Sequence, residues 1–170
     1  AHYYFETKED LLVAAIQRGC QPALQAWEDA GLSPTGQLPE DANPLALARL
    51  GFDMAKRELH QYQDLFRLTF DMFGVGTHNP KIAAAVSDFI EERRGFIARI
   101  TRGVIAGMAN RPDSSADAIA AAIWGSLHGI YLQKVIDPGF DADAAIDALS
   151  EIVFAFAFAA GRATAESESA

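Results

Sequence analysis

The 170-residue sequence predicts an all-α protein, and two observations carry that prediction. Apolar residues recur at helical spacing almost throughout, and no stretch alternates apolar and polar residues between turn signals as a half-buried strand does. The start signals also belong to helices. An Asn-Pro pair occurs at residues 43–44 and again at 79–80, and each places a capping side chain before a proline at the first helical position. Half of the residues are hydrophobic, which is enough for one helical domain with a substantial core.

The first helix is expected over residues 8–30. Thr7 precedes it as an N-cap, and Asp10 stands where the acid of a capping box belongs. Gly31 supplies the glycine that commonly follows the last helical turn. Residues 19–22 begin with glycine and end with proline. Because proline lacks a backbone donor and crowds the preceding turn, we predict a kink or break there.

Residues 32–43 contain two prolines and a glycine and are predicted to form a loop inside the domain. The two Asn-Pro pairs open the second and fourth helices, and Gly74–Gly76 ends the third. A serine at 114 or 115 caps the fifth helix, and Asp141 caps the sixth. The expected helices cover residues 44–59, 62–73, 80–109, 114–136 and 142–163, followed by a frayed polar tail at 164–170.

The last two helices lack a polar face. A helix that is apolar on most of its circumference must be covered on most of it. A domain of this size buries one such helix more readily than two, so we expect the pair to pack against its copy in a two-fold homodimer. One large monomeric core is the alternative. The residues expected at the dimer interface are Ile119, Ile123, Leu127, Leu149, Ile152 and Phe156.

Charge and cysteine content limit the functions open to this segment. Its 14 basic and 23 acidic residues give a formal charge of -9, which argues against a nucleic-acid surface within it, since phosphate binding uses Lys and Arg. The single Cys20 cannot form an internal disulfide and is expected to be a core residue in a reducing cytoplasm. No secretory signal is visible, and no apolar stretch reaches the roughly 20 residues that cross a bilayer. We therefore expect a soluble, cytoplasmic protein with no membrane partner.

The opening residues carry a more specific signal. Residues 2–12 read His-Tyr-Tyr-Phe-Glu-Thr-Lys-Glu-Asp-Leu-Leu: an aromatic cluster, a short turn and a helix start. This run resembles the junction in tetracycline-repressor (TetR) family regulators, which joins the recognition helix of a helix-turn-helix to the ligand-sensing domain. The resemblance implies a TetR-like C-terminal ligand-binding and dimerisation bundle over residues 8–163. Residues 1–7 would then be the end of the DNA-recognition helix and its turn.

A TetR-like chain would be a ligand-responsive DNA-binding transcriptional regulator, most simply a repressor that a small organic effector releases from its operator. The resemblance implies that Tyr3, Tyr4 and Lys8 contact DNA phosphates, which positions the protein without reading bases. It also implies that an effector tilts the helix at residues 8–30 and so changes the spacing of the two DNA-binding heads in the homodimer. Residues 19–22 are the expected hinge.

Aromatic residues at helical spacing are the candidates for an effector pocket. Their first role is core packing, but aromatics and methionine between helices also line apolar ligand sites. A polar group aimed into the same space would favour a pocket. His128 and Asp71 are the two candidates, although a hydrogen-bonded core histidine and a solvated aspartate are the simpler interpretations. The expected pocket residues are Phe66, Phe70, Phe73, Phe89, Phe96, Trp124, His128 and Tyr131.

Patterns for metal binding and catalysis are absent from the sequence. No acid precedes a histidine by three residues, no cysteine pair offers a zinc site, and no glycine-rich phosphate loop follows a strand. The run Glu-Glu-Arg-Arg at residues 91–94 is most simply a solvated face with i,i+3 ion pairs. We therefore expect no metal, no cofactor and no enzymatic activity. Two alternatives stay open: a helical-bundle enzyme that uses His128 with a nearby acid, and a protein-interaction module.

Overall fold

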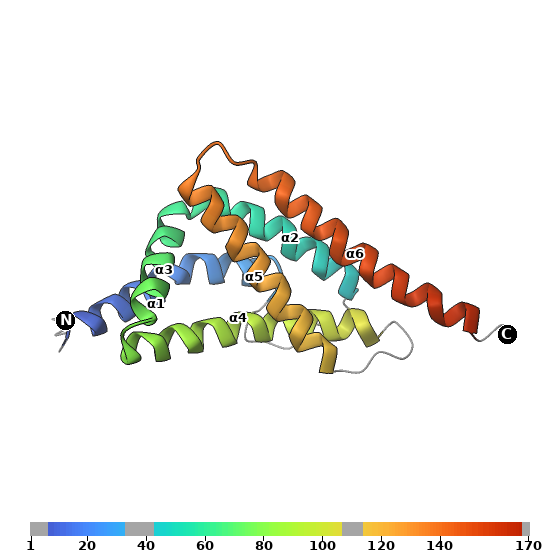
Figure 1. Ribbon diagram of the computed structural model, residues 1–170, viewed down its shortest axis with the longest axis horizontal. Helices are drawn as coiled ribbons and strands as arrows, with labels where there is room; N and C mark the ends of the chain where they lie inside the picture. Colours follow the sequence, from blue (N-terminus) through green and yellow to red (C-terminus); the bar gives the residue numbers. More distant parts are fainter. Residues whose placement is uncertain (1–6, 33–42, 107–113, 168–170) are drawn as a thin grey trace.

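The computed structural model describes residues 7–32, 43–106 and 114–167, and it describes only the backbone of Ile16, residues 114–115 and residues 157–167. Over these ranges the chain forms six helices and no strand, which confirms the predicted all-α class (Figure 1). The helices are α1 (Lys8–Asp29), α2 (Pro44–Gln61), α3 (Gln63–Gly76), α4 (Pro80–Ala106), α5 (Ser114–Ile136) and α6 (Ala142–Ser167).

The predicted starts of α1, α2, α4 and α6 are confirmed by their capping bonds, whereas the side chains of the serines predicted to cap α5 lie outside the described residues. The Asp10 backbone N–H donates to Thr7 Oγ1 at 3.2 Å, and the Thr7 N–H donates to the Asp10 carboxylate at 3.0 Å, which completes the capping box. Asn43 and Asn79 each accept two backbone N–H bonds from the first turns of α2 and α4. Asp141 accepts the N–H bond of Ala144 at the start of α6.

The C-terminal ends of the helices agree less well with the ends predicted from the sequence. Gly31 adopts φ +80, as predicted for the glycine after α1, and the next N–H reaches back to the Trp27 carbonyl. The predicted break at residues 19–22 does not occur, because α1 continues through Pro22. The third helix does not stop at Phe73 but runs to Gly76, and α6 continues to Ser167. Residues 107–109, predicted as the last of the fourth helix, lie outside the described residues.

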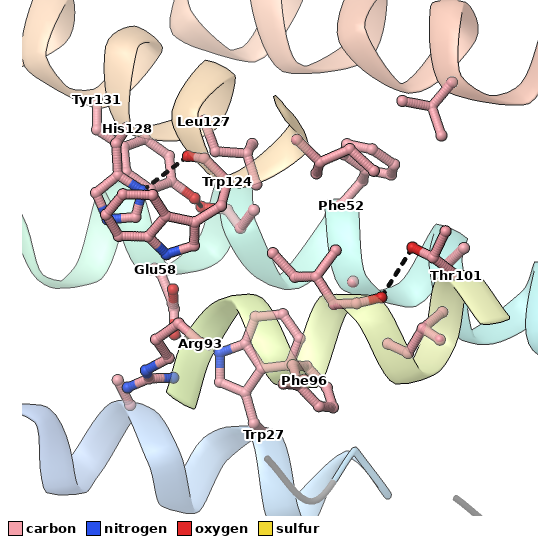
Figure 2. A pocket seen from close by; sticks show the side chains of 18 of the residues that line it. Trp27, Phe52, Glu58, Arg93, Phe96, Thr101, Trp124, Leu127, His128 and Tyr131 are labelled. Atoms are coloured by element: carbon pink, nitrogen blue, oxygen red, sulfur yellow. Dashed lines mark hydrogen bonds between the residues drawn. The ribbon is translucent and has the colours of Figure 1, made fainter. Parts of the chain in front are cut away.

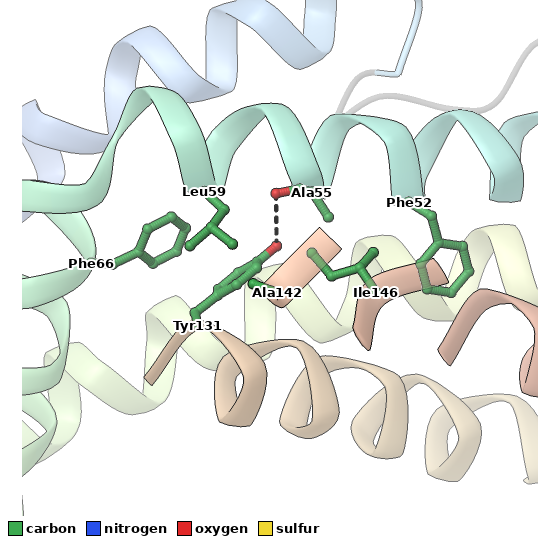
Figure 3. Packing of buried hydrophobic residues seen from close by; sticks show 7 residues of the cluster. All are labelled: Phe52, Ala55, Leu59, Phe66, Tyr131, Ala142 and Ile146. Carbon is green, nitrogen blue, oxygen red and sulfur yellow. Dashed lines mark hydrogen bonds between the residues drawn. The ribbon is translucent and has the colours of Figure 1, made fainter. Parts of the chain in front are cut away.

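The helices form a compact bundle in which α4 spans the base of the view and α5 crosses it diagonally (Figure 1). α2 packs against α4 on one side and α6 on the other, while α3 bridges α1, α4 and α5. Three apolar clusters hold this arrangement. The largest joins α2, α3, α5 and α6 (Figure 3), and its buried residues are Phe52, Ala55, Leu59, Phe66, Tyr131, Ala142 and Ile146.

The two smaller clusters fix α1 to the rest of the bundle. Cys20 of α1 packs with Met72 and Ile82, and it is buried as the sequence predicts. Leu32, which follows the end of α1, packs with Phe96 and Ile100 of α4. Within the described ranges, every helix is too short or too polar to span a bilayer.

Candidate functional site

A mostly apolar cavity of about 180 Å³ lies among the helices, and all six contribute residues to its wall. For scale, an engineered cavity of about 150 Å³ in another protein binds benzene. Aliphatic side chains such as Ile100, Ile119 and Val153 line one part of the wall. The charged side chains Glu58 and Arg93 lie in the other part, together with Trp27, Trp124 and His128 (Figure 2). The space therefore suits a small organic molecule better than water alone.

The charged part of the wall is built around the carboxylate of Glu58, on α2. Trp27 of α1 donates its indole N–H to Glu58 Oε1. The Trp27 ring packs edge-on against Phe96 of α4, with ring centroids 5.3 Å apart and an interplanar angle of 89°. The hydrogen bond and the ring contact therefore tie α1 to both α2 and α4 at the cavity wall.

Arg93, on α4, brings a positive charge to the same part of the cavity. Figure 2 shows its guanidinium on the same side of the cavity as the Glu58 carboxylate, and its charge acts on the pKa of that carboxyl. The Arg93 Cζ atom lies 5.5 Å from the centroid of the Phe89 ring, in a cation–π arrangement. Burial raises the pKa of the Glu58 carboxyl, and the Trp27 hydrogen bond and the Arg93 charge oppose that rise.

His128, on α5, is held neutral by its surroundings. Its ring stacks on Trp124, with centroids 3.7 Å apart and an interplanar angle of 23°. Nδ1 lies 3.0 Å from the Trp124 carbonyl oxygen, so Nδ1 carries the proton and donates it. Burial lowers the pKa of His128 to about 4; the Trp124 carbonyl raises it and the Arg93 charge lowers it further. The hydrogen bond that positions His128 therefore comes from its own helix. A histidine that acts as a catalytic base is commonly oriented by a carboxylate instead.

Three hydroxyl groups in the cavity wall already have acceptors. The Tyr131 hydroxyl donates to the Ala55 carbonyl at 3.3 Å. The Thr69 and Thr101 hydroxyls each donate, at 2.8 Å, to a carbonyl one turn earlier in their own helices. Glu58 and Arg93 are the charged residues among those that line the cavity in the described part of the chain.

The structure brings most of the predicted pocket residues to this cavity. Six of them line it: Phe66, Phe89, Phe96, Trp124, His128 and Tyr131. Phe70 and Phe73 do not line it; their rings pack edge-on against each other, with centroids 5.9 Å apart, and both also contact the His128 ring. Asp71 is exposed, as its simpler interpretation held.

The predicted dimer residues divide between the inside and the outside of the protomer. Ile119, Ile123 and Leu127 line the cavity, so they face inward within one chain. Leu149 packs against the largest apolar cluster. Ile152 is 66% exposed, and Phe156 is 49% exposed while also touching the cavity. Leu132 and Ile136 of α5, which were not predicted for an interface, are also exposed, at 40% and 73%.

Of the predicted DNA contacts, Tyr3 and Tyr4 lie outside the described residues, whereas Lys8 is exposed at the first position of α1. This end of α1 is bound to the start of α4. Lys81 Nζ lies 2.6 Å from an Asp10 carboxylate oxygen, and the Asn79 side chain donates to Glu9 at 3.3 Å. We refer to these two contacts as the α1–α4 clamp.

Glu58, Arg93 and Trp27 are site residues that the sequence reasoning missed. The interpretation of residues 91–94 as a solvated face is wrong for Arg93, which is half-buried at the cavity. The available signal was its phase in the helix: Arg93 follows Phe89 by four residues and precedes Phe96 by three, so it lies within the apolar stripe of α4.

No group of three His, Cys, Asp or Glu side chains among the described residues is placed to hold a metal ion. The one histidine with a carboxylate partner in that part of the chain is His60, whose Nε2 lies 2.9 Å from Asp143 Oδ2. This pair is half-exposed and joins α2 to α6 on the surface, away from the cavity wall.

Comparison with known families adds one finding. A family model described as the C-terminal domain of BetI-type transcriptional repressors matches residues 57–157, which is more than half of the chain. The match runs from the end of α2 through most of α6 and so includes both Glu58 and Arg93. No curated protein and no solved structure matches the chain.

Proposed function

The chain belongs to the TetR family of transcriptional regulators, as a BetI-type C-terminal domain, and on that basis we propose that it senses a small organic effector and represses transcription until the effector binds. The observation that carries this proposal is the cavity enclosed by the six helices, with two charged residues in an otherwise mostly apolar wall. Such a space is typical of a ligand site. Family membership points to a regulatory protein rather than an enzyme.

α1 is the element best placed to carry a signal from the cavity. Its residues Cys20, Ala23 and Trp27 line the cavity, and its first turn is held by the α1–α4 clamp. The resemblance implies that the DNA-binding head precedes Lys8, so movement of α1 would move the head. An effector shifts this equilibrium only if it prefers one position of α1 over the other.

We further propose that the regulator acts as a homodimer through α5 and α6. Exposed apolar residues on both helices support this, because contact between two copies would remove their side chains from water. The four with the clearest exposure are Leu132, Ile136, Ile152 and Phe156. Sedimentation of the purified chain tests the proposal, since a monomer at micromolar concentration would contradict it.

DNA binding by the full gene product is the direct test of the regulatory function. The probe is the DNA that flanks its own coding region, at one fixed salt concentration, with and without cell extract. Specific binding that the extract weakens supports an effector-relieved repressor. Absence of specific binding to any flanking fragment contradicts the proposal.

A cavity-filling variant tests whether the effector acts through this space. A Cβ atom added at Gly51, which lines the cavity, meets no atom within 4 Å. Gly51→Leu should therefore fold, bind the operator and no longer respond to the extract. Gly95→Leu is the matched control, because Gly95 also has open space around its Cβ position but does not line the cavity. A normal response in Gly51→Leu would contradict an effector site here.

A further inference from the structure

The cavity has one charged end and one apolar end. Along α4, the wall runs from Arg93 through Ile97, Ile100 and Val104 to Ile105. At 1.5 Å per residue, that is about 18 Å from the charged end to the aliphatic end. Glu58 stands at the Arg93 end, whereas Thr101 lies toward the other end and gives its hydroxyl proton to the Ile97 carbonyl (Figure 2).

The charged end contains one group of each sign. A cationic ligand would meet Glu58 but also Arg93, and an anionic ligand would meet the same pair with the signs reversed. A charge that leaves water needs a partner that is not already compensated, and otherwise its desolvation opposes binding. The Arg93 charge opposes the rise in the pKa of Glu58, so each group offsets part of the charge of the other, and an ion of either sign would meet one group of like charge.

A neutral polar head fits this end of the cavity. A carboxylate accepts hydrogen bonds and a guanidinium donates them, so a group that does both can satisfy the pair at once. Hydroxyl and primary amide groups have this property. The Trp27 N–H occupies one oxygen of Glu58, which leaves the other oxygen for a ligand donor.

We infer that the cavity binds a small uncharged molecule with an apolar body and a single hydroxyl or amide head, the head lying between Glu58 and Arg93. The inference rests on the proposed function of the cavity as the effector site. The volume of about 180 Å³ limits the body to the size of one ring or a short chain. Apolar side chains cover the body, and the two opposite charges favour a neutral head over an ion of either sign.

The two tryptophans of the chain provide a direct measurement. Trp27 and Trp124 both line the cavity, so intrinsic fluorescence reports on its occupancy without a label or DNA. The probes share one skeleton and differ in their heads: cyclohexylmethanol, cyclohexylmethylamine and cyclohexanecarboxylate. We expect the alcohol to change the fluorescence saturably and to bind the full chain at least about tenfold more tightly than either charged probe. Equal or tighter binding of either charged probe, or no saturable change with the alcohol, overturns the inference.

Single substitutions then test the role of each charge. Glu58→Gln leaves the Arg93 charge unmatched and should improve binding of the carboxylate at least about tenfold, and Arg93→Gln should do the same for the amine. Glu91→Gln and Arg94→Gln make the same charge changes at exposed positions of α4 and serve as controls. If either Glu58→Gln or Arg93→Gln does not fold, the remaining variant and the probe selectivity of the unsubstituted chain still test the inference. Unchanged selectivity in a folded cavity variant contradicts the assigned position of the head.

This test is separable from that of the regulatory function. If the alcohol binds with the expected selectivity but the full gene product recognises no flanking DNA, the assignment of the ligand class stands and the repressor proposal fails. If extract releases the protein from DNA while the charged probes bind best, the repressor proposal stands and the inference fails.

Discussion

The Trp27–Glu58 hydrogen bond offers the sharpest test of how the cavity wall is held together. Trp27→Phe removes the donor while keeping a ring to pack against Phe96. An acceptor left unsatisfied in a buried site costs about 1–3 kcal/mol, and the smaller ring adds a packing loss. We expect the free energy of unfolding to fall by roughly 2–3 kcal/mol in urea titrations. For a chain of this size, that corresponds to a drop of roughly 4–12 °C in Tm.

A double-mutant cycle isolates the hydrogen bond from the packing. Glu58→Met removes the acceptor and its charge but keeps the length of the side chain. Because replacing both partners by apolar groups is nearly neutral, Trp27→Phe should cost much less in the Glu58→Met background. We expect a coupling energy of about 1–2 kcal/mol. Equal costs in the two backgrounds, within about 0.5 kcal/mol, would refute the reasoning.

The pH dependence gives the same cycle a second readout. Burial raises the pKa of Glu58 in the folded chain above its ordinary value of 4.5. The contribution of Glu58 to the free energy of unfolding is therefore fully present below pH 4.5 and is lost as the pH rises through the folded-state pKa. The Trp27 bond lowers that pKa, so its removal should cost more at neutral pH than below 4.5. Urea titrations at the two pH values measure the difference.

Two further predictions concern α5 and α1. The folded-state pKa of His128 is lowered from 6.5 to about 4, so the chain should lose roughly 2–4 kcal/mol of stability as the pH falls between these values. His128→Phe, which keeps a ring on Trp124, should remove that part of the pH dependence in urea titrations. Pro22→Ala restores a backbone donor inside α1 and should stabilise the chain by about 1–3 kcal/mol. In a reporter assay with the full gene product, Pro22→Ala should alter induction more than effector affinity; unchanged induction would count against a hinge.

The starts of the helices were predictable because their signals are local. Thr7 with Asp10, and the two Asn-Pro pairs, satisfy the first N–H groups with side chains only two or three residues away. The end of α3 was not predictable in this way. Gly74 and Gly76 suggested a stop, but Thr77 and Asn79 continue the backbone bonds to Phe73 and Val75 and complete the last turn. The low helix propensity of glycine is a weak effect, and these backbone hydrogen bonds outweigh it.

The cavity was predictable in part, and the reason lies in which side chains carry the signal. Aromatic residues on α3, α4 and α5 indicated a core or a pocket, because aromatic side chains between helices serve in either role. The charged residues gave no such indication. Glu58 follows Arg57 and Arg93 lies in a run of four charged residues, and both settings are typical of a solvent-exposed surface. Their burial depends on contacts from α1, in particular the Trp27 indole, and sequence spacing within one helix does not contain that information.

These contacts also limit how strongly an effector can act through α1. The helix has 22 residues and a length of about 33 Å, and it is held at both ends: by the α1–α4 clamp at its start and by the Trp27–Glu58 bond near its end. A head group that binds Glu58 can weaken or release only the second contact. Since that contact is worth about 1–3 kcal/mol, the coupling between effector and DNA should lie between about 5-fold and 150-fold. A larger ratio of operator affinities, measured with and without saturating effector, would require the effector to loosen the clamp as well.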